Sequence, residues 1–273
     1  MPELPDLTIV AEQLAARAAG RTVREATAPA PILVRATPRE LVALEGTILG
    51  PARRRGKFLL LPFDRDGVTE RVLAANPMLA GRFWLLDDSK PKVRARTGLR
   101  LSFTDGGELR YVDREMLGKL YLVAPDALDS IPGWTEMGPD ADDPALTLEA
   151  FRQRIRRHPG ELKSLLRNPK FVAGIGNAYS DEFLWEARLA PLRRRSSISQ
   201  DQVDDLYRAM RGVLAEATER LRDLVPPNIE VQHREFLKVH LRGGEPCPRC
   251  GRPLRQIGGD EATTFCRTCQ PPF

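Results

Sequence analysis

Cysteine is scarce in this chain of 273 residues, and all four cysteines lie between Cys247 and Cys269. In a cytosolic protein such a cluster favours a metal site over disulfide bonds. Long apolar runs are missing as well, since no stretch approaches the roughly 18 consecutive apolar residues of a membrane-spanning helix. Residues 11–24 are too charged for the apolar core of a signal peptide. The sequence therefore predicts a soluble, cytosolic protein with no membrane partner.

A large excess of charge of one sign is also missing. The chain has 42 lysines and arginines against 37 aspartates and glutamates, a formal net charge of +5. This balance permits a polyanionic partner, but any basic surface that binds one must be local. Hydrophobic residues make up 42% of the chain, enough for a buried core, which excludes global disorder. The length fits one large or two modest domains.

The N-terminal letters MPELPD are the first place where chemistry is indicated. An initiator methionine is usually removed when a small residue such as proline follows it, and Pro2 then carries a free secondary amine. Such an amine forms an iminium with a sugar aldehyde carbon, and its pKa of about 8 leaves a neutral fraction at neutral pH. Glu3 beside it is a candidate general acid or base. The alternative is that Pro2 has no role, as in most proteins with proline at this position.

Residues 23–123 consist of short β-rich runs separated by turns of Gly, Pro and Asp. Asp105-Gly106-Gly107 between two of these runs is a hairpin signal. An amphipathic pattern over 7–19 precedes them, so we expect a helix followed by a β-sandwich of roughly 120 residues. The expected strands include 32–34, 57–63, 81–86, 99–103 and 109–112.

Two places in this β-rich part have an alternative to a purely structural role. The basic run from Arg53 to Lys57 opens a strand, and it is either a solvated face or a phosphate-binding element that includes Lys57. The apolar run 76–81 lies between strands. It either belongs to the core or supplies side chains such as Met78 and Leu79 that wedge into a base stack.

The second half of the chain has a helical pattern. The turn 168–177 contains Gly174 and Gly176, whose backbone N–H groups at a helix N-terminus form an anion site. Asn177 adds a side-chain donor. A tight turn between packed helices is the alternative. The helices are expected, after a proline-rich stretch 125–144, at 147–157, 161–167, 178–188 and 202–224.

Metal binding is indicated at the C-terminal end of the sequence. Cys247 and Cys250 are separated by fifteen residues from Cys266 and Cys269, a spacing that fits a Cys₄ zinc site. Four thiolates leave no open coordination position, so we expect one structural zinc ion rather than a catalytic one. The β-prone residues before Cys266 favour a two-stranded ribbon closed by the metal. Basic residues around the cysteines favour a nucleic-acid partner.

These motifs occur together in one order along the chain. That order resembles the formamidopyrimidine-DNA glycosylase / endonuclease VIII family of base-excision repair enzymes. The resemblance implies an α+β fold with DNA held in a cleft. Its parts are an N-terminal helix plus β-sandwich (1–124), a linker (125–145), a helix–two-turn–helix domain (146–239) and a zinc finger (240–273). The motifs that carry it are Pro2-Glu3-Leu4-Pro5, Arg54-Arg55-Gly56-Lys57, Gly138-Pro139, Val172-Ala173-Gly174-Ile175-Gly176-Asn177-Ala178-Tyr179, and Gly244-Glu245-Pro246-Cys247 through Cys269-Gln270.

The resemblance also implies roles for individual residues. Pro2 attacks the sugar C1′ of a flipped-out nucleotide and displaces a damaged base, and Glu3 protonates the ring oxygen or helps proton transfers. The iminium then permits elimination, so the enzyme also nicks the strand. Lys57 and Asn177 grip the phosphates beside the lesion, and Lys57 is counted with Pro2 and Glu3 among the catalytic residues. The loop 77–81 fills the hole. The residues expected at the DNA are Lys57, Met78, Leu79, Arg114, Met116, Asn177 and Arg267.

Four departures from the family pattern bear on the substrate. Asp6 replaces a common glutamate, which puts its contact to the flipped nucleotide in doubt. In the loop 113–118, Met116 and Leu117 replace an arginine that faces the partner base and a phenylalanine wedge. Glu261 replaces an arginine of the zinc hairpin, and Thr263, Thr264 or Arg267 are the candidate substitutes. The stretch 226–239 is shorter than the loop that caps oxidised guanine, so the sequence predicts a divergent member with another lesion preference.

Three functions from different classes follow. The first is a bifunctional DNA glycosylase and abasic-site lyase, monomeric, that acts on damaged duplex DNA. The second keeps the fold and the DNA but acts only on abasic sites, or binds damage without catalysis. The third is a zinc-ribbon transcription or RNA-binding module, which leaves the N-terminal motif unexplained.

Overall fold

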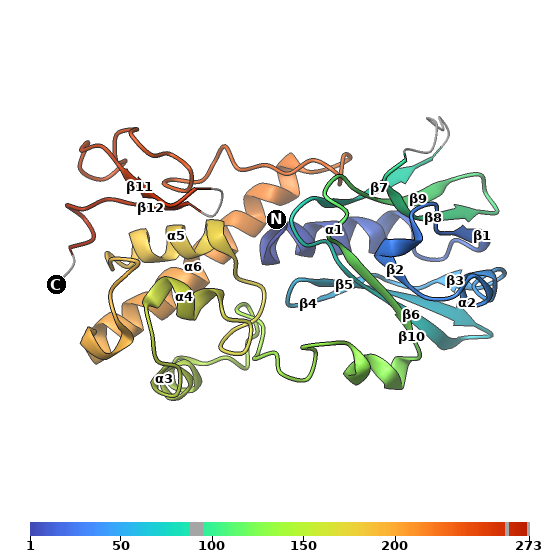
Figure 1. The fold of residues 1–273 in the computed structure, drawn as a ribbon, viewed down its shortest axis with the longest axis horizontal. Coiled ribbons are helices and arrows are strands. Elements are labelled where there is room, and N and C mark those ends of the chain that lie inside the picture. Colours follow the sequence, from blue (N-terminus) through green and yellow to red (C-terminus); the bar gives the residue numbers. More distant parts are fainter. Residues whose placement is uncertain (88–94, 260–261, 272–273) are drawn as a thin grey trace. The chain divides into compact units, whose positions relative to one another are not determined.

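The computed structural model describes residues 1–87, 95–259 and 262–271. The chain forms two compact units, and each is made of two stretches (Figure 1). Met1–Thr135 and Arg220–His233 form the first unit, and Glu136–Glu219 and Arg234–Phe273 form the second. Across the described residues, no helix has both the length and the apolar character needed to cross a membrane.

The first unit contains two sheets (Figure 1). One sheet is antiparallel with the order β1-β8-β9-β7, and the other has the order β2-β10-β6-β5-β3 with β4 paired to β5. The predicted N-terminal β-sandwich is therefore confirmed. The strands are β1 Val23–Thr27, β2 Val34–Arg35, β3 Ile48–Leu49, β4 Arg53–Arg55, β5 Phe58–Arg65, β6 Val68–Asn76, β7 Gly81–Leu86, β8 Thr97–Phe103, β9 Glu108–Asp113 and β10 Lys119–Val123.

Two of the local differences from the sequence expectations are 3-10 helices. Ile32 and Leu33 lie in a 3-10 helix, η1 (Pro31–Leu33), because Pro31 presets the backbone of its first position. A second 3-10 helix, η2 (Pro125–Ser130), occupies part of the expected linker and packs against β6. The hairpin at 105–107 forms as predicted, and a short helix, α2 (Pro38–Val42), follows β2.

Helix α1 (Leu4–Arg17) runs between the two sheets in Figure 1. It begins three residues before the expected start at Leu7, because Pro5 is well tolerated in the first turn of a helix. Most of its side chains are buried, and each buried leucine contributes about 1.5–3 kcal/mol relative to an exposed one. This packing fixes the N-terminal residues against the sandwich. The buried apolar residues are Leu4, Leu7, Ile9, Val10, Ala11 and Leu14.

The end of helix α6 (Gln200–Leu224) and the segment after it return to α1. Arg222 donates two hydrogen bonds to the Glu12 carboxylate, at 3.0 and 2.8 Å. Arg17 donates to the Pro227 carbonyl oxygen at 2.7 Å. These bonds explain why residues 220–233 belong to the first unit, although they lie far from residues 1–135 in the sequence.

The second unit contains helices and one ribbon. Helices α3 (Leu148–Arg156), α4 (Leu162–Arg167) and α5 (Asn177–Glu186) pack with the first part of α6 around buried aromatic rings such as Phe151 and Phe171. Strands β11 (Arg255–Ile257) and β12 (Thr263–Phe265) pair antiparallel. The predicted helical region and two-stranded ribbon are both confirmed.

Candidate active site and DNA interface

Pro2 and Glu3 are buried at the start of α1, and 2% of Glu3 is exposed. The Glu3 N–H donates to Asp6 Oδ2 at 2.7 Å, which caps the helix. The Asp6 carboxylate therefore has a local partner, and it lies on the wall of the same cavity as Pro2.

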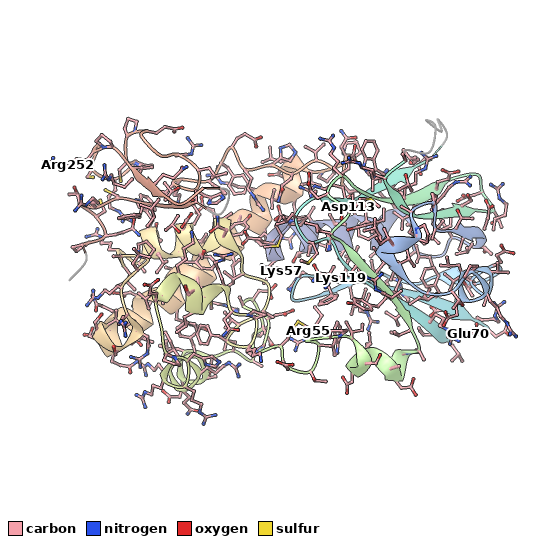
Figure 2. The ribbon with its side chains drawn as sticks, viewed as in Figure 1. Arg55, Lys57, Glu70, Asp113, Lys119 and Arg252 are labelled. Atoms are coloured by element: carbon pink, nitrogen blue, oxygen red, sulfur yellow. The ribbon has the colours of Figure 1, made fainter. Side chains whose placement is uncertain are left out.

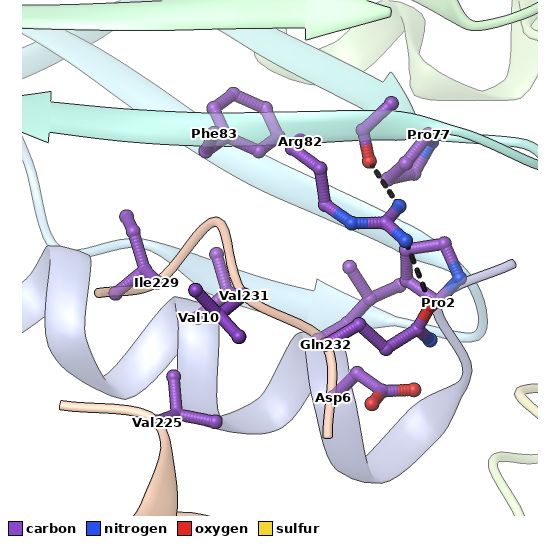
Figure 3. A pocket seen from close by; sticks show the side chains of 12 residues that line it. Pro2, Asp6, Val10, Pro77, Arg82, Phe83, Val225, Ile229, Val231 and Gln232 are labelled. Carbon is purple, nitrogen blue, oxygen red and sulfur yellow. Dashed lines mark hydrogen bonds between the residues drawn. The ribbon is translucent and has the colours of Figure 1, made fainter. Parts of the chain in front are cut away.

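The cavity beside Pro2 is largely apolar (Figure 3). Helix α1, strand β7 and the segment 225–232 each contribute walls. The polar groups on these walls, Asp6, Arg82 and Gln232, are few and lie near Pro2 in Figure 3. The lining residues are Pro2, Asp6, Leu7, Val10, Pro77, Gly81, Arg82, Phe83, Val225, Ile229, Val231 and Gln232.

Arg82 and Gln232 form a hydrogen-bonded pair that the sequence did not suggest. Arg82 Nη2 donates to Gln232 Oε1 at 2.7 Å, and Arg82 Nη1 donates to the Gly81 carbonyl at 2.8 Å (Figure 3). Gln232 Nε2 in turn donates to the Met1 carbonyl oxygen at 3.2 Å. The pair also lines a neighbouring groove together with Leu79 and Arg114. It therefore borders both this groove and the cavity beside Pro2.

Two loops with exposed apolar side chains lie next to each other in the first unit. Gly81 pairs with Asp113 across β7 and β9, and Asn76 pairs with Lys119 across β6 and β10. The loop 77–80 joins β6 to β7, and the loop 114–118 joins β9 to β10. Because β7 pairs with β9 and β6 pairs with β10, the two loops begin and end beside each other. Leu79 is 50% exposed and Leu117 is 46% exposed, whereas Met78 is half-buried. Leu79 and Leu117 are thus the more exposed of the apolar side chains on these loops.

Asp113 shapes the loop 114–118 from its first residue. Its buried carboxylate accepts backbone N–H bonds from Glu115 at 3.0 Å, Leu117 at 3.1 Å and Gly118 at 2.6 Å. Within this loop Arg114 is exposed, and Met116 is half-buried with a φ of 56°, a left-handed conformation that is uncommon for methionine. The loop conformation is therefore held by one carboxylate rather than by regular pairing.

Tyr111 lies beneath both loops. A Cβ on Gly81 would come within 1.9 Å of the Tyr111 hydroxyl, and one on Gly118 within 1.8 Å. Only glycine fits at these two positions. Burial, followed by the nearby Asp113 carboxylate, raises the pKa of Tyr111 above its ordinary value, so the hydroxyl stays neutral.

Basic side chains gather at the same end of the second sheet as the loop 77–80. Lys57 lies in the turn between β4 and β5, not in a strand as expected, because Gly56 adopts a φ of 55° and closes a tight hairpin. Arg54 Nε donates to Thr8 of α1 at 2.9 Å and anchors this hairpin. Lys119, missed from the sequence, is exposed where β10 pairs with the end of β6 (Figure 2).

Asn177 is the first residue of α5 and follows the glycine-bearing turn. Its Nδ2 donates to the Ala262 carbonyl oxygen at 2.9 Å, which joins the turn to the ribbon. The amide nitrogen carries a second hydrogen for another acceptor. Lys163 Nζ lies 2.6 Å from Asp181 Oδ1 and 3.4 Å from the same Ala262 oxygen. Asn177 is thus oriented by the zinc ribbon within the second unit.

A buried glutamate of α5 holds the segment that leads to the ribbon. Glu182 accepts backbone N–H bonds from Lys238 at 2.8 Å, Val239 at 2.9 Å and His240 at 2.9 Å. Burial raises the pKa of Glu182, and these three bonds oppose the rise. The carboxylate therefore connects α5 with the start of the zinc-binding segment.

The four cysteine sulfurs have the spacing of a tetrahedral zinc site. All four lie within 4.8 Å of one another, with 3.9 Å between Cys247 and Cys269 and 3.5 Å between Cys250 and Cys266. Zn–S bonds of about 2.3 Å in a tetrahedron place sulfurs about 3.8 Å apart, so the residues fit the ion. Trp185 Nε1 donates to Cys247 Sγ at 3.4 Å, which ties the site to α5.

Three residues of the ribbon were suggested as substitutes for the missing hairpin arginine, and one of them remains a candidate for contacting a phosphate. Arg267 is exposed. Thr264 is buried, and its hydroxyl accepts the Leu241 N–H at 3.2 Å, so it already has a structural partner. Thr263 is half-buried, and Glu261 lies outside the described residues. Arg267 is therefore the best placed of the three to contact a phosphate.

Comparison with known proteins gives three profile matches. They are the formamidopyrimidine-DNA glycosylase N-terminal domain over residues 1–120, the formamidopyrimidine-DNA glycosylase H2TH domain over 137–225, and the zinc finger found in FPG and IleRS over 244–272. The zinc-finger match and the cysteine geometry together confirm the predicted zinc ion. The helix–two-turn–helix assignment is confirmed as well.

Individual relatives match along the whole chain. The formamidopyrimidine-DNA glycosylase of Symbiobacterium thermophilum is 33% identical, over 99% of this chain and 90% of the relative. The wild-type Lactococcus lactis Fpg (MutM), solved with an N7-benzyl-Fapy-dG containing DNA, is 25% identical with a TM-score of 0.88, over 99% of this chain and 100% of that one. The same bacterium's enzyme bound non-covalently to DNA containing an AP site has a TM-score of 0.85 at 25% identity, over 98% and 99%.

Proposed function

Because the chain belongs to the formamidopyrimidine-DNA glycosylase family, we propose that it is a bifunctional DNA glycosylase and abasic-site lyase with Pro2 as its nucleophile. The observation that carries this proposal is the place of Pro2, which is buried beside Glu3 at the edge of a cavity. Removal of Met1 turns the Pro2 nitrogen into a secondary amine at that edge. The enzyme acts as a monomer on damaged duplex DNA.

The proposed reaction has two parts. The Pro2 nitrogen bonds to C1′ of a flipped-out nucleotide as the bond from C1′ to the damaged base breaks, and the proton that the nitrogen gives up neutralises the departing base. The C1′–O4′ bond then opens to give the iminium, and O4′ takes a proton from Glu3. Loss of a proton from C2′ and departure of the 3′ phosphate cut the strand.

The proposed DNA contacts fall into two groups. Lys57, Lys119 and Arg114 in the first unit, and Asn177 and Arg267 in the second, hold phosphates, because their donors are basic or are amides beside a helix N-terminus. Apolar side chains fill the hole that a flipped nucleotide leaves. These are Leu79 and Leu117, with Met78 and Met116 beside them.

Replacing Leu79 by alanine should weaken binding to a duplex with an abasic-site analogue about tenfold, which is about 1.4 kcal/mol, because alanine leaves the hole in the base stack unfilled. Affinity for the undamaged duplex should change little. Val68→Ala is the matched control, since Val68 is an exposed residue at the opposite end of β6. Equal affinities of the two variants for damaged DNA would show that Leu79 is not a wedge.

A second candidate function is supported by the loop 114–118. Met116 provides no hydrogen-bond donor toward a partner base, unlike the arginine that is common in the family at this position. A protein that reads the partner base weakly suits a lyase that acts on abasic sites alone, or a damage-binding protein without catalysis. The same loop favours a lesion preference other than that of the 8-oxoguanine type.

One assay separates these functions. The protein is incubated with duplexes that carry different damaged bases or an abasic site, with borohydride present to reduce an iminium to a stable adduct. Adducts on a damaged base and on the abasic site support the bifunctional enzyme. Adducts on the abasic site alone support the lyase, and the absence of any adduct shows that the iminium proposal is wrong.

A further inference from the structure

The carbonyl group of the Met1–Pro2 peptide bond occupies the position that the sugar carbon and its ring oxygen take in the proposed reaction. Its carbonyl carbon is bonded to the Pro2 nitrogen, and its oxygen accepts a hydrogen bond from Gln232 Nε2 at 3.2 Å. In the covalent intermediate of the proposed reaction, C1′ is the carbon bonded to that nitrogen, and O4′ is the oxygen on that carbon. Gln232 thus aims an N–H at the place where O4′ lies once Met1 is gone.

The orientation of this amide is set by its partners. Arg82 has only donors, so the side it faces on Gln232 must be the oxygen, which accepts at 2.7 Å. A flipped amide would place two donors against each other at Arg82 and two acceptors at Met1. Arg82 is itself held by the Gly81 carbonyl at 2.8 Å. The N–H of Gln232 therefore points to the terminus without rearrangement.

We propose that Gln232, oriented by Arg82, donates a hydrogen bond to O4′ of the target sugar and assists its ring opening. The proposal rests on Pro2 being the nucleophile. As the C1′–O4′ bond breaks, its electron pair moves to O4′ while the nitrogen lone pair forms the C=N bond. The proton that O4′ finally gains comes from Glu3, and the Gln232 N–H stabilises the negative charge until that transfer.

The chemistry of this donor suits the intermediate. The iminium is a cation, and a cationic donor next to it would be repelled. Gln232 is neutral. The charged Arg82 lies behind it and contacts its amide oxygen, so the Gln232 amide separates Arg82 from the iminium. The hydrogen bond from Arg82 polarises the amide, which makes its N–H a stronger donor. Gln232 is thus a catalytic residue and Arg82 a positioning residue.

The test uses the processed full-length protein and an abasic-site duplex. Gln232→Leu should slow single-turnover borohydride trapping by about a hundredfold, the usual effect of one lost transition-state donor. Thermal stability, and affinity for a tetrahydrofuran-containing duplex, should stay unchanged. Gln153→Leu, at an exposed glutamine of α3, is the control and should trap at the wild-type rate.

Gln232→Glu distinguishes a donor from a merely structural group. Its carboxylate still accepts from Arg82 but donates nothing until it is protonated. The rate of this variant relative to wild type should therefore be low at neutral pH and should rise as the pH falls. The proposal is overturned if Gln232→Leu traps at the wild-type rate. It is also overturned if the trapping rate of Gln232→Glu relative to wild type is the same at every pH. Absence of any wild-type adduct would instead overturn Pro2 chemistry itself.

Discussion

A chain that keeps residues in front of Pro2 is expected to lose covalent trapping on abasic DNA by at least about a thousandfold. An uncleaved N-terminal tag makes the Pro2 nitrogen an amide, whose lone pair is delocalised into the carbonyl. Such a nitrogen cannot form an iminium. DNA binding should persist, because the proposed phosphate contacts lie elsewhere. Borohydride adducts, strand cleavage and the N-terminal mass are measured together.

The matched control is the same chain after a protease has removed the tag and left Pro2 at the terminus, which should restore trapping. Pro2→Gly is a milder test, since it exchanges the secondary amine for a primary one and should lower the rate without abolishing it. Trapping by the tagged chain at the rate of the processed chain would mean that another side chain is the nucleophile. Lys57 would then be examined first.

The parts predicted correctly from the sequence depend on short-range physics. The hairpin at 105–107 follows from glycines that accept unusual backbone angles, and the ribbon follows from the spacing of the cysteine pairs. Helix α5 follows from a turn with Gly174, whose φ is 95°. Each signal lies within a few residues of the element that it predicts, so periodicity and turn chemistry suffice.

The parts that were missed depend on contacts between distant residues. Arg82 and Gln232 are 150 positions apart, and Gln232 and Met1 are 231 apart. The segment that carries Gln232 has no regular structure, so no periodicity points to its partner. Lys119 was missed for a related reason: its place beside the loop 77–80 follows from strand pairing, which the sequence does not specify.

Two local errors have a different cause. Lys57 and Ile32 were placed in strands because the residues around them are β-prone. Gly56 and Pro31 decide otherwise, since each imposes a backbone angle that ends or delays the strand. A single residue with a strong backbone preference therefore outweighs the average propensity of its neighbours.

Removing the zinc should unfold the ribbon and weaken DNA binding about tenfold or more, while the sandwich stays folded. Binding of a structural zinc ion supplies on the order of 10 kcal/mol to such small elements, which lack a core of their own. Without the ribbon, Asn177 loses its bond to Ala262 and Arg267 loses its fixed place. Cys250→Ser is the sharper variant, because Cys250 is exposed and its loss removes a ligand without opening the core.

Thr268→Ala, at an exposed residue of the same segment that is not a ligand, is the control and should bind zinc and DNA normally. The sandwich is followed by its own thermal transition, since Met1–Thr135 contains the strands of both sheets. Loss of that transition together with the zinc would mean that the two units fold as one. Unchanged DNA affinity in Cys250→Ser would mean that neither Asn177 nor Arg267 holds a phosphate, and the interface would then be confined to the first unit.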